Sequence, residues 1–171
     1  FGEAGRQIQD FLWGDFADWY VEIAKVQLEA SAGAEQQANT RAVLYGVLEG
    51  SLRLLHPFMP FVTEDAWQYL TANRRQTVAL PASIMVAPYP TADAGALDDA
   101  AERDFALLQE LISSVRNVRN EYKVEPARWV AATVAAGARA AMLNEQRSQI
   151  VRLARVADEQ LSVVEQLDAK P

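Results

Sequence analysis

Apolar residues recur at spacings of three and four along much of the chain, and this period predicts helices. The first helix is expected from about residue 3 to residue 29, where Gly33 follows closely and favours a helix end. A second helix is expected from about residue 34 to residue 55, because Pro57 cannot continue it. The first helix has a wide inward face, which consists of Ile8, Leu12, Phe16, Trp19, Ile23 and Val26.

The third predicted helix begins at Thr63, whose hydroxyl can accept a hydrogen bond from a free backbone N–H of the first turn. Trp67 and Leu70 are its inward residues. Residues 71–91 lose the helical period and contain three prolines, so they are expected to form an extended connection with one short strand at residues 83–87.

A fourth helix is expected from about residue 98 to residue 123, with a seam typical of antiparallel bundles. The seam consists of Phe105, Leu108, Ile112, Val115, Arg119 and Tyr122. Beyond it, residues 129–134 and 161–165 resemble strands that can pair in parallel across an amphipathic helix at residues 139–155. We therefore predict a mainly α protein, with a four-helix-bundle-like domain at residues 1–125 and a small α/β appendage at residues 126–171.

Composition narrows the possible functions. The 171 residues are half hydrophobic and include no cysteine, which excludes disulfides and thiolate metal sites. No apolar run approaches the length of a membrane span, so we expect no membrane partner. The formal net charge of -7 argues against a protein that coats nucleic acid through an overall positive field, although a local basic patch remains compatible with it.

The residue types that carry catalysis are not arranged for it. His56 is the single histidine and has no metal-ligand spacing around it, so we expect it to cap the preceding helix or to pack in the turn. The acidic pairs Glu64-Asp65 and Asp98-Asp99 fall at predicted helix starts, where the helix dipole explains them. No glycine-rich phosphate loop or nucleophile motif is present, and we predict neither a catalytic residue nor a bound metal or cofactor.

Two stretches resemble one family closely. They are FLWGDFADWYVEIAK at residues 11–25 and LLHPFMPFVTEDAW at residues 54–67, and both are similar to segments of valyl-tRNA synthetase, a class I synthetase family. A weaker similarity lies in VRNVRNEYKVEP at residues 115–126. The resemblance covers residues 4–126 well and extends less specifically to Val164. Ala17 and the pair Asp65-Ala66 depart from the usual family residues, which makes two core contacts smaller.

The resemblance implies that a longer parent enzyme joins valine to its tRNA with ATP and magnesium in the cytoplasm. The family's catalytic signatures, editing domain and C-terminal coiled coil do not occur in this sequence, so the chain is expected to be a fragment that ends before the coiled coil and is inactive alone. Its implied partners are the anticodon stem-loop of the valine tRNA and the catalytic domain of the same chain. The parent is expected to be a monomer.

RNA loops are bound by stacking of bases on flat or apolar side chains, with Arg and Lys on the backbone. For stacking we nominate Phe11, Leu12 and Trp13, whose alternative role is core packing. For the backbone we nominate residues that share a helix face, Arg116, Arg119 and Lys123.

Intramolecular pairing is the alternative for these cations, for instance a bridge from Arg119 to Asp18 or Glu22. Two other functions also remain open. The chain could be the anticodon-binding domain of an isoleucyl- or leucyl-tRNA synthetase, or a helical protein-docking module that binds no RNA.

Overall fold

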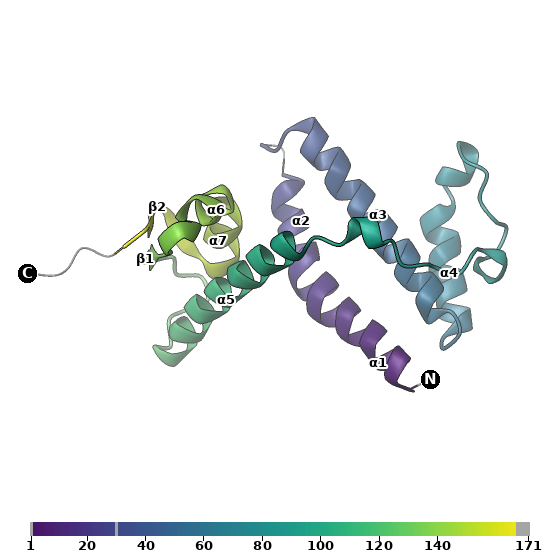
Figure 1. Ribbon diagram of the computed structural model, residues 1–171, viewed down its shortest axis with the longest axis horizontal. Coiled ribbons are helices and arrows are strands. Elements are labelled where there is room, and N and C mark those ends of the chain that lie inside the picture. Colours follow the sequence, from purple (N-terminus) through teal and green to yellow (C-terminus); the bar gives the residue numbers. More distant parts are fainter. Residues whose placement is uncertain (1, 30, 167–171) are drawn as a thin grey trace, which may run out of the picture. The chain divides into compact units, whose positions relative to one another are not determined.

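The computed structural model describes residues 2–29 and 31–166 of the chain (Figure 1). These residues form two units, Phe1–Gly95 and Ala96–Pro171, and each is described by itself. Both units together are mainly helical with one small parallel sheet, which confirms the predicted fold class. The division predicted after residue 125 falls inside the second unit, and the membership of residues 98–123 in a bundle with the first three helices stays a prediction.

The first unit begins with one long helix whose middle part is wider than an α-helix. It consists of α1 (Gly2–Asp10), the π-helical segment η1 (Phe11–Tyr20) and α2 (Val21–Gln27). The backbone remains helical across both junctions, and Val21 N–H donates to the carbonyl of Phe16, five residues earlier. A single helix over residues 3–29 is therefore confirmed, and its predicted inward face is buried or half-buried throughout. The π turns were not predicted.

Helix α3 (Ala34–Leu55) has the predicted ends, whereas α4 (Pro60–Thr71) begins before the predicted residue. The prediction that Thr63 caps α4 is wrong. Pro60 occupies the first turn, where a residue without a backbone N–H fits well because that N–H would have no helical partner. Thr63 is buried inside the helix, and its hydroxyl donates to the carbonyl of Met59 at 2.8 Å.

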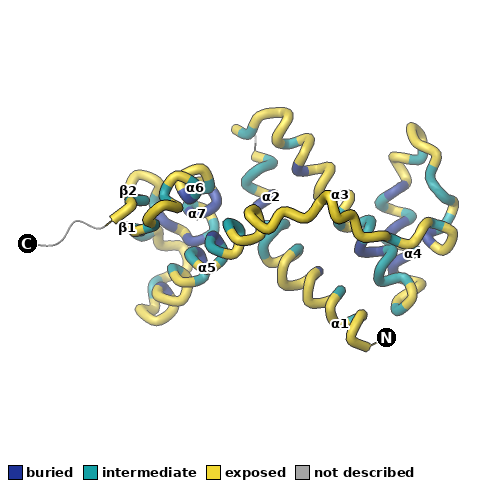
Figure 2. Tube along the Cα trace, in the orientation of Figure 1, coloured by how far each residue is buried: buried dark blue, intermediate teal, exposed yellow. Residues whose placement is uncertain are grey.

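The core of the first unit lies between α3 and α4 and is centred on Trp67, with Leu52 and Ile84 beside it. Figure 2 shows the buried stretches gathered where these two helices face each other. The indole N–H of Trp67 donates to Glu49 Oε1 at 3.0 Å, and the other oxygen of Glu49 accepts from Arg53 at 2.7 Å. Arg75 lies over the Trp67 ring, 5.1 Å from its centre. Trp67 is thus packed against both apolar and charged neighbours.

The connection after α4 contains three short 3₁₀ turns, η2 (Arg74–Gln76), η3 (Ile84–Val86) and η4 (Ala94–Ala96). The predicted strand at residues 83–87 is wrong, because this apolar run folds as η3 and packs on α4. Ser83 caps the turn by accepting from Met85 N–H at 3.1 Å. Buried Ile84 belongs to the Trp67 core, so the segment is apolar because it packs on α4.

Glu64 joins α4 to this connection. Its side chain accepts from Gln68 at 2.5 Å, from the Ser83 hydroxyl at 2.8 Å and from Ile84 N–H at 3.0 Å. The hydrogen bond from Gln68 is the main cause that lowers the pKa of Glu64, and those from Ser83 and Ile84 lower it further. The helix dipole alone therefore does not explain this acidic residue, contrary to the prediction.

Acid is expected to weaken the first unit through Glu64. Because the folded pKa is below the ordinary value of 4.5, the stabilisation is fully present above that pH and is lost as pH falls through the folded pKa. Glu64→Gln should therefore lower the melting temperature at pH 7 and make less difference near pH 3. Thermal melts across this range test the expectation, with the exposed neighbour Asp65→Asn as a control. An equal loss at both pH values would contradict it.

The second unit opens with α5 (Asp99–Glu121), which Asp98 caps by accepting from the N–H groups of Ala100 and Ala101, both at 3.0 Å. The prediction that the Asp98-Asp99 pair marks a helix start is confirmed. The two predicted strands are also confirmed as a parallel pair, β1 (Val130–Ala135) and β2 (Val156–Val164).

The predicted helix at residues 139–155 is instead a 3₁₀ turn followed by two α-helices, η5 (Gly137–Arg139), α6 (Ala140–Glu145) and α7 (Arg147–Ala154). Gln146 leaves helical geometry between α6 and α7. Helix α7 packs on both α5 and β2, so the small sheet and α5 share one core. The large hydrophobic residues buried in this core are Leu108, Ile112, Leu143, Ile150, Val156 and Leu161.

The described residues contain neither a membrane-spanning helix nor a metal-binding cluster. Within residues 2–29 and 31–166, no helix has the length and apolar character needed to cross a membrane. Over the same residues, no three histidine or acidic side chains come close enough together to hold a metal ion.

Candidate nucleic-acid interface

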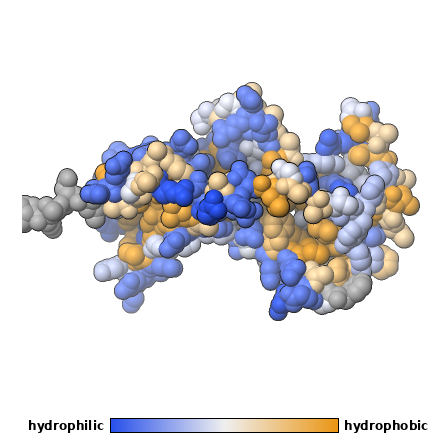
Figure 3. Space-filling view, viewed as in Figure 1, coloured by the Kyte–Doolittle hydropathy of each residue, from blue (hydrophilic) through white to orange (hydrophobic). Residues whose placement is uncertain are grey.

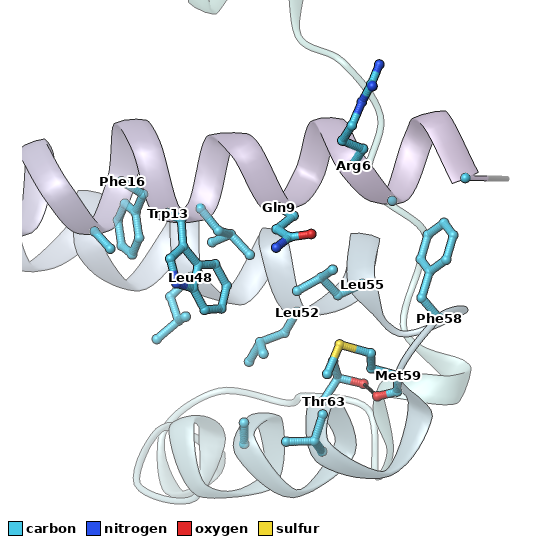
Figure 4. A pocket seen from close by; sticks show the side chains of 16 residues that line it. Arg6, Gln9, Trp13, Phe16, Leu48, Leu52, Leu55, Phe58, Met59 and Thr63 are labelled. Carbon is cyan, nitrogen blue, oxygen red and sulfur yellow. Dashed lines mark hydrogen bonds between the residues drawn. The ribbon is translucent and has the colours of Figure 1, made fainter.

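An apolar groove of about 890 Å³ opens on the first unit between its first helix, α3 and α4. Figure 3 shows hydrophobic side chains gathered in the region of α1 and α4. In the close view of Figure 4, Gln9, Trp13 and Phe16 extend from the first helix toward α3 and α4. Leu48, Leu52 and Leu55 of α3 and Met59, Val62 and Thr63 of the α4 side complete most of the lining.

The three residues nominated for base stacking have different positions relative to this groove. Leu12 lines it but is only 9% exposed, so it forms part of the floor. Trp13 also lines it and is 67% exposed, which leaves much of its ring open to solvent. Phe11 is 42% exposed but is not among the lining residues. The groove therefore presents one open aromatic ring, that of Trp13.

The π-helical segment carries this ring. Such segments are usually short and occur frequently at functional sites, because the wider turn directs side chains differently from an α-helix. Within it, the rings of Phe16 and Tyr20 lie 6.1 Å apart and nearly parallel, and burial raises the pKa of Tyr20. Trp13 is the most exposed aromatic residue of this segment and lies about one turn before the packed Phe16.

Gln9 is a groove residue that the sequence reasoning missed. It lies one helical turn before Trp13 and points into the groove beside Leu52 and Leu55 (Figure 4). Its amide offers a donor and an acceptor together, which is the pattern needed to bind the edge of a base. The spacing of four residues between Gln9 and Trp13 was the available signal in the sequence.

His56 packs in the turn between α3 and α4, which is one of the two roles predicted for it. Its Nδ1 lies 2.8 Å from the hydroxyl oxygen of Thr63. The same hydroxyl donates to the carbonyl of Met59 at 2.8 Å. The histidine therefore orders the turn at one end of the groove.

The nominated cations lie in the second unit, on α5 or just after it, and Arg116 and Arg119 contact the end of α7. Arg116 Nε donates to the carbonyl of Leu153 at 2.9 Å. Arg119 is only 8% exposed and donates to the carbonyls of Arg155 at 3.4 Å and Glu125 at 3.2 Å. Arginine suits this place, because the last carbonyls of a helix lack helical partners and carry partial negative charge.

Lys123 and Arg119 differ in exposure and in their hydrogen-bond partners. Lys123 follows α5, is exposed and has a left-handed backbone with φ 49°. Arg119 has intramolecular partners, as the alternative interpretation required, but they are backbone carbonyls and not Asp18 or Glu22. Glu22 instead pairs with Lys25 at 2.5 Å. The structure thus brings Arg116 and Arg119 together at α7, while Phe11, Leu12 and Trp13 belong to the first unit.

Comparison with known proteins identifies the family. Residues 1–134 match the family model described as the anticodon-binding domain of tRNA ligase. Valine–tRNA ligase of Dehalococcoides mccartyi is 43% identical over 155 residues, which are 91% of this chain and 17% of that relative. The enzyme of Thermosynechococcus vestitus is 40% identical, with 91% of this chain and 16% of the relative covered.

The chloroplastic/mitochondrial valine–tRNA ligase 2 of Arabidopsis thaliana is 39% identical over 90% of this chain and 15% of its own length. The chain spans about a sixth of the length of these curated relatives. All three relatives are named valine–tRNA ligases, so the alternative of an isoleucyl- or leucyl-tRNA synthetase is not favoured. On the strength of the family match, which extends from the groove through α5 into β1, this chain belongs to the anticodon-binding domains of tRNA ligases.

Proposed function

We propose that the chain recognises the anticodon stem-loop of a valine tRNA as part of a valyl-tRNA synthetase. The family match, together with the similarity to valine–tRNA ligases over about 90% of the chain, carries this proposal. The open groove beside Trp13 supports it physically, since RNA loops are read by turning bases out of the stack and binding them against flat side chains.

The first unit supplies base recognition in this proposal. A turned-out base stacks on the exposed face of Trp13, with its edge toward the Gln9 amide (Figure 4). The lining is mostly apolar, so a base that enters loses water and its hydrogen bonds to Gln9 become more selective. Leu12 supports the ring from below, and Phe11 stays a candidate for a neighbouring base outside the groove.

The second unit supplies contacts to the backbone. Arg116 lies on α5 and Lys123 follows its end, and both are exposed. We propose that they contact phosphates. Arg119 is assigned a positioning role, because both of its bonded nitrogens are committed to carbonyls of the unit and the side chain is buried. This division leaves the overall charge of -7 compatible with RNA binding, because only local charges touch the RNA.

The activity of the whole enzyme belongs to the same proposal. A parent synthetase joins valine to its tRNA with ATP and magnesium, which residues outside this chain bind. The catalytic domain of the same polypeptide is then the protein partner of this chain. We propose a monomeric, cytoplasmic enzyme, in which this chain selects the tRNA and does not itself activate valine.

Trp13→Ala is the direct test of the groove. Stacking of one base on an aromatic ring contributes about 1–3 kcal/mol, so affinity for a valine anticodon stem-loop should fall by roughly 5- to 150-fold. Fluorescence anisotropy with a labelled hairpin measures this effect. The matched control is Tyr69→Ala, since Tyr69 is an exposed aromatic on α4 that does not line the groove.

The same titrations separate the competing functions. Hairpins with valine and isoleucine anticodons should be distinguished by the native chain and poorly distinguished by Trp13→Ala. Binding should also weaken steeply as the logarithm of salt concentration rises, which docking onto an apolar protein surface would not do. Equal affinity for the two hairpins, or no binding in dilute buffer, would refute anticodon recognition by this chain.

A further inference from the structure

Cationic side chains concentrate at one end of the second unit. Residues 116–130 and 150–157 contain six Arg and Lys residues against two carboxylates, an excess of four positive charges in a chain whose net charge is -7. The six are Arg116, Arg119, Lys123, Arg128, Arg152 and Arg155. This local excess contrasts with the acidic character of the protein, which makes it a candidate site for a polyanion.

Backbone contacts bring these segments together in space. Arg116 and Arg119 of α5 donate to the carbonyls of Leu153 and Arg155 at the end of α7. The carbonyl of Arg155 also accepts from the N–H of Val130, where β1 begins, at 3.2 Å. The ends of α5 and α7 and the starts of both strands therefore meet around Arg155.

Part of this charge has an internal explanation and part does not. Arg116 and Arg119 complete the end of α7, where cations are favourable. Elsewhere in the unit, Arg139 pairs with Asp104 and Arg147 pairs with Asp158. Across the described part of the chain, by contrast, Lys123, Arg128 and Arg155 form no ion pair, and all three are exposed.

The backbone at two of these cations is a second, independent observation. Among residues 2–29 and 31–166, Lys123 and Arg155 are the two non-glycine residues with positive φ, at 49° and 53°. Each follows a helix, at a place where glycine or asparagine is ordinarily preferred because a side chain with Cβ is strained there. Residues held in such strained conformations cluster at functional sites, which supports a role for these two positions.

Flat side chains accompany the cations. Tyr122 directly precedes Lys123, and Trp129 directly follows Arg128, and both rings are exposed. Alternation of cations with exposed aromatic rings is the arrangement by which proteins bind nucleic acid without reading its sequence. The end surface, defined as Tyr122, Lys123, Arg128, Trp129 and Arg155, has this composition.

We propose that the end surface binds the sugar-phosphate backbone of the same RNA, independently of its sequence. This inference rests on the proposed function, which it extends by naming Arg128 and Arg155 as phosphate contacts and Arg119 as a positioning residue for Arg155. Arg119 donates to the carbonyl of Arg155, whose backbone is left-handed and which is exposed.

The test compares the 171-residue chain with its double variant Arg128→Gln/Arg155→Asn. Asparagine tolerates the left-handed conformation, so the fold should persist, and circular dichroism checks that it does. Two lost phosphate contacts should reduce the slope of log affinity against log salt by about 1.4–1.8 and lower the affinity near 0.1 M salt about tenfold or more. The ratio of affinities for hairpins with different anticodons should not change.

The matched control is Arg41→Gln/Arg103→Gln, which removes the same charge from two exposed arginines outside the end surface. Its salt slope should equal that of the native chain. An unchanged slope in the Arg128/Arg155 variant, or an equal loss in the control, would overturn the inference. A third result would also overturn it. If the native chain binds heparin and the hairpin equally well, and the double variant loses affinity for both to the same extent, the surface binds polyanions in general.

The outcomes also separate this inference from the proposed function. If Trp13→Ala and changed anticodons act as expected while the double variant keeps its slope, only the end surface is wrong. If the slope falls but neither Trp13→Ala nor a changed anticodon has an effect, the end surface binds RNA and anticodon recognition is wrong.

Discussion

Replacing Trp67 by alanine is expected to lower the free energy of unfolding by about 3–5 kcal/mol. Trp67 is 1% exposed and is the largest side chain of the core between α3 and α4. Its removal leaves a cavity lined by Leu52 and Ile84, and it takes away the donor that Glu49 Oε1 accepts from. The loss therefore combines the transfer of a large apolar group with an unpaired carboxylate oxygen.

Urea unfolding followed by circular dichroism measures this loss, and Trp13→Ala is the matched control. Trp13 is the same residue type but is largely exposed, so its replacement should change stability by less than about 1 kcal/mol. The two variants should thus behave oppositely, since Trp67→Ala impairs folding and Trp13→Ala impairs RNA binding. Similar losses of stability in both would show that the groove is closed over Trp13 in solution.

Arg119→Met is expected to lower the free energy of unfolding by roughly 2–3 kcal/mol, because hydrogen bonds from a charged group contribute about 1.5–3 kcal/mol. Methionine keeps much of the side-chain length but donates no hydrogen bond. The carbonyls of Arg155 and Glu125 then lose a donor beside the buried end of α7. Urea unfolding measures the effect, and exposed Arg103→Met on the same helix should stay within about 0.5 kcal/mol of the native chain.

Binding measurements on the same variant distinguish positioning from contact. If Arg119 positions Arg155, Arg119→Lys should restore little stability, because a lysine cannot supply two donors in the fixed geometry of a guanidinium. A stable Arg119→Met protein whose salt slope alone falls would instead show that Arg119 reaches a phosphate directly.

The sequence predicted those elements whose determinants are local. Helix α3 has both ends where glycine and proline place them, and Asp98 caps α5 as its position before the helix implies. The two strands were recognised from short apolar runs and paired correctly, because a helix between them requires a parallel crossover. In these cases the residue pattern and the final contacts agree.

One error arose where tertiary contacts override a local pattern, and another where one local signal outweighs a second. The apolar run at residues 83–87 resembles a strand, but Ile84 packs on Trp67 and Ser83 bonds to Glu64, so it forms a turn. Thr63 has the residue type of a helix cap but lies inside α4, because Pro60 begins the helix earlier. The fold of residues 83–87 depends on partners distant in sequence, whereas the start of α4 has a local signal in Pro60, three residues before Thr63.

For the candidate interface, the sequence predicted the segment involved but not the role of each residue in it. Phe11, Leu12 and Trp13 were nominated together, although only Leu12 belongs to the predicted inward face. The structure separates them into a residue outside the groove, a floor and an open ring. Gln9 and the junction around Arg155 required the packed structure, because the groove and the end of α7 are formed by segments distant in sequence.

The wide turns of η1 affect how residue roles transfer between relatives. An α-helix rotates by about 100° per residue, and a π-helical stretch rotates by less, so the two drift out of phase over the ten residues from Phe11 to Tyr20. In a homologue whose helix stays α-helical here, the residue aligned with Trp13 would therefore point in a different direction. Equivalent positions in this helix must therefore be matched by the direction of the side chain, not by alignment column.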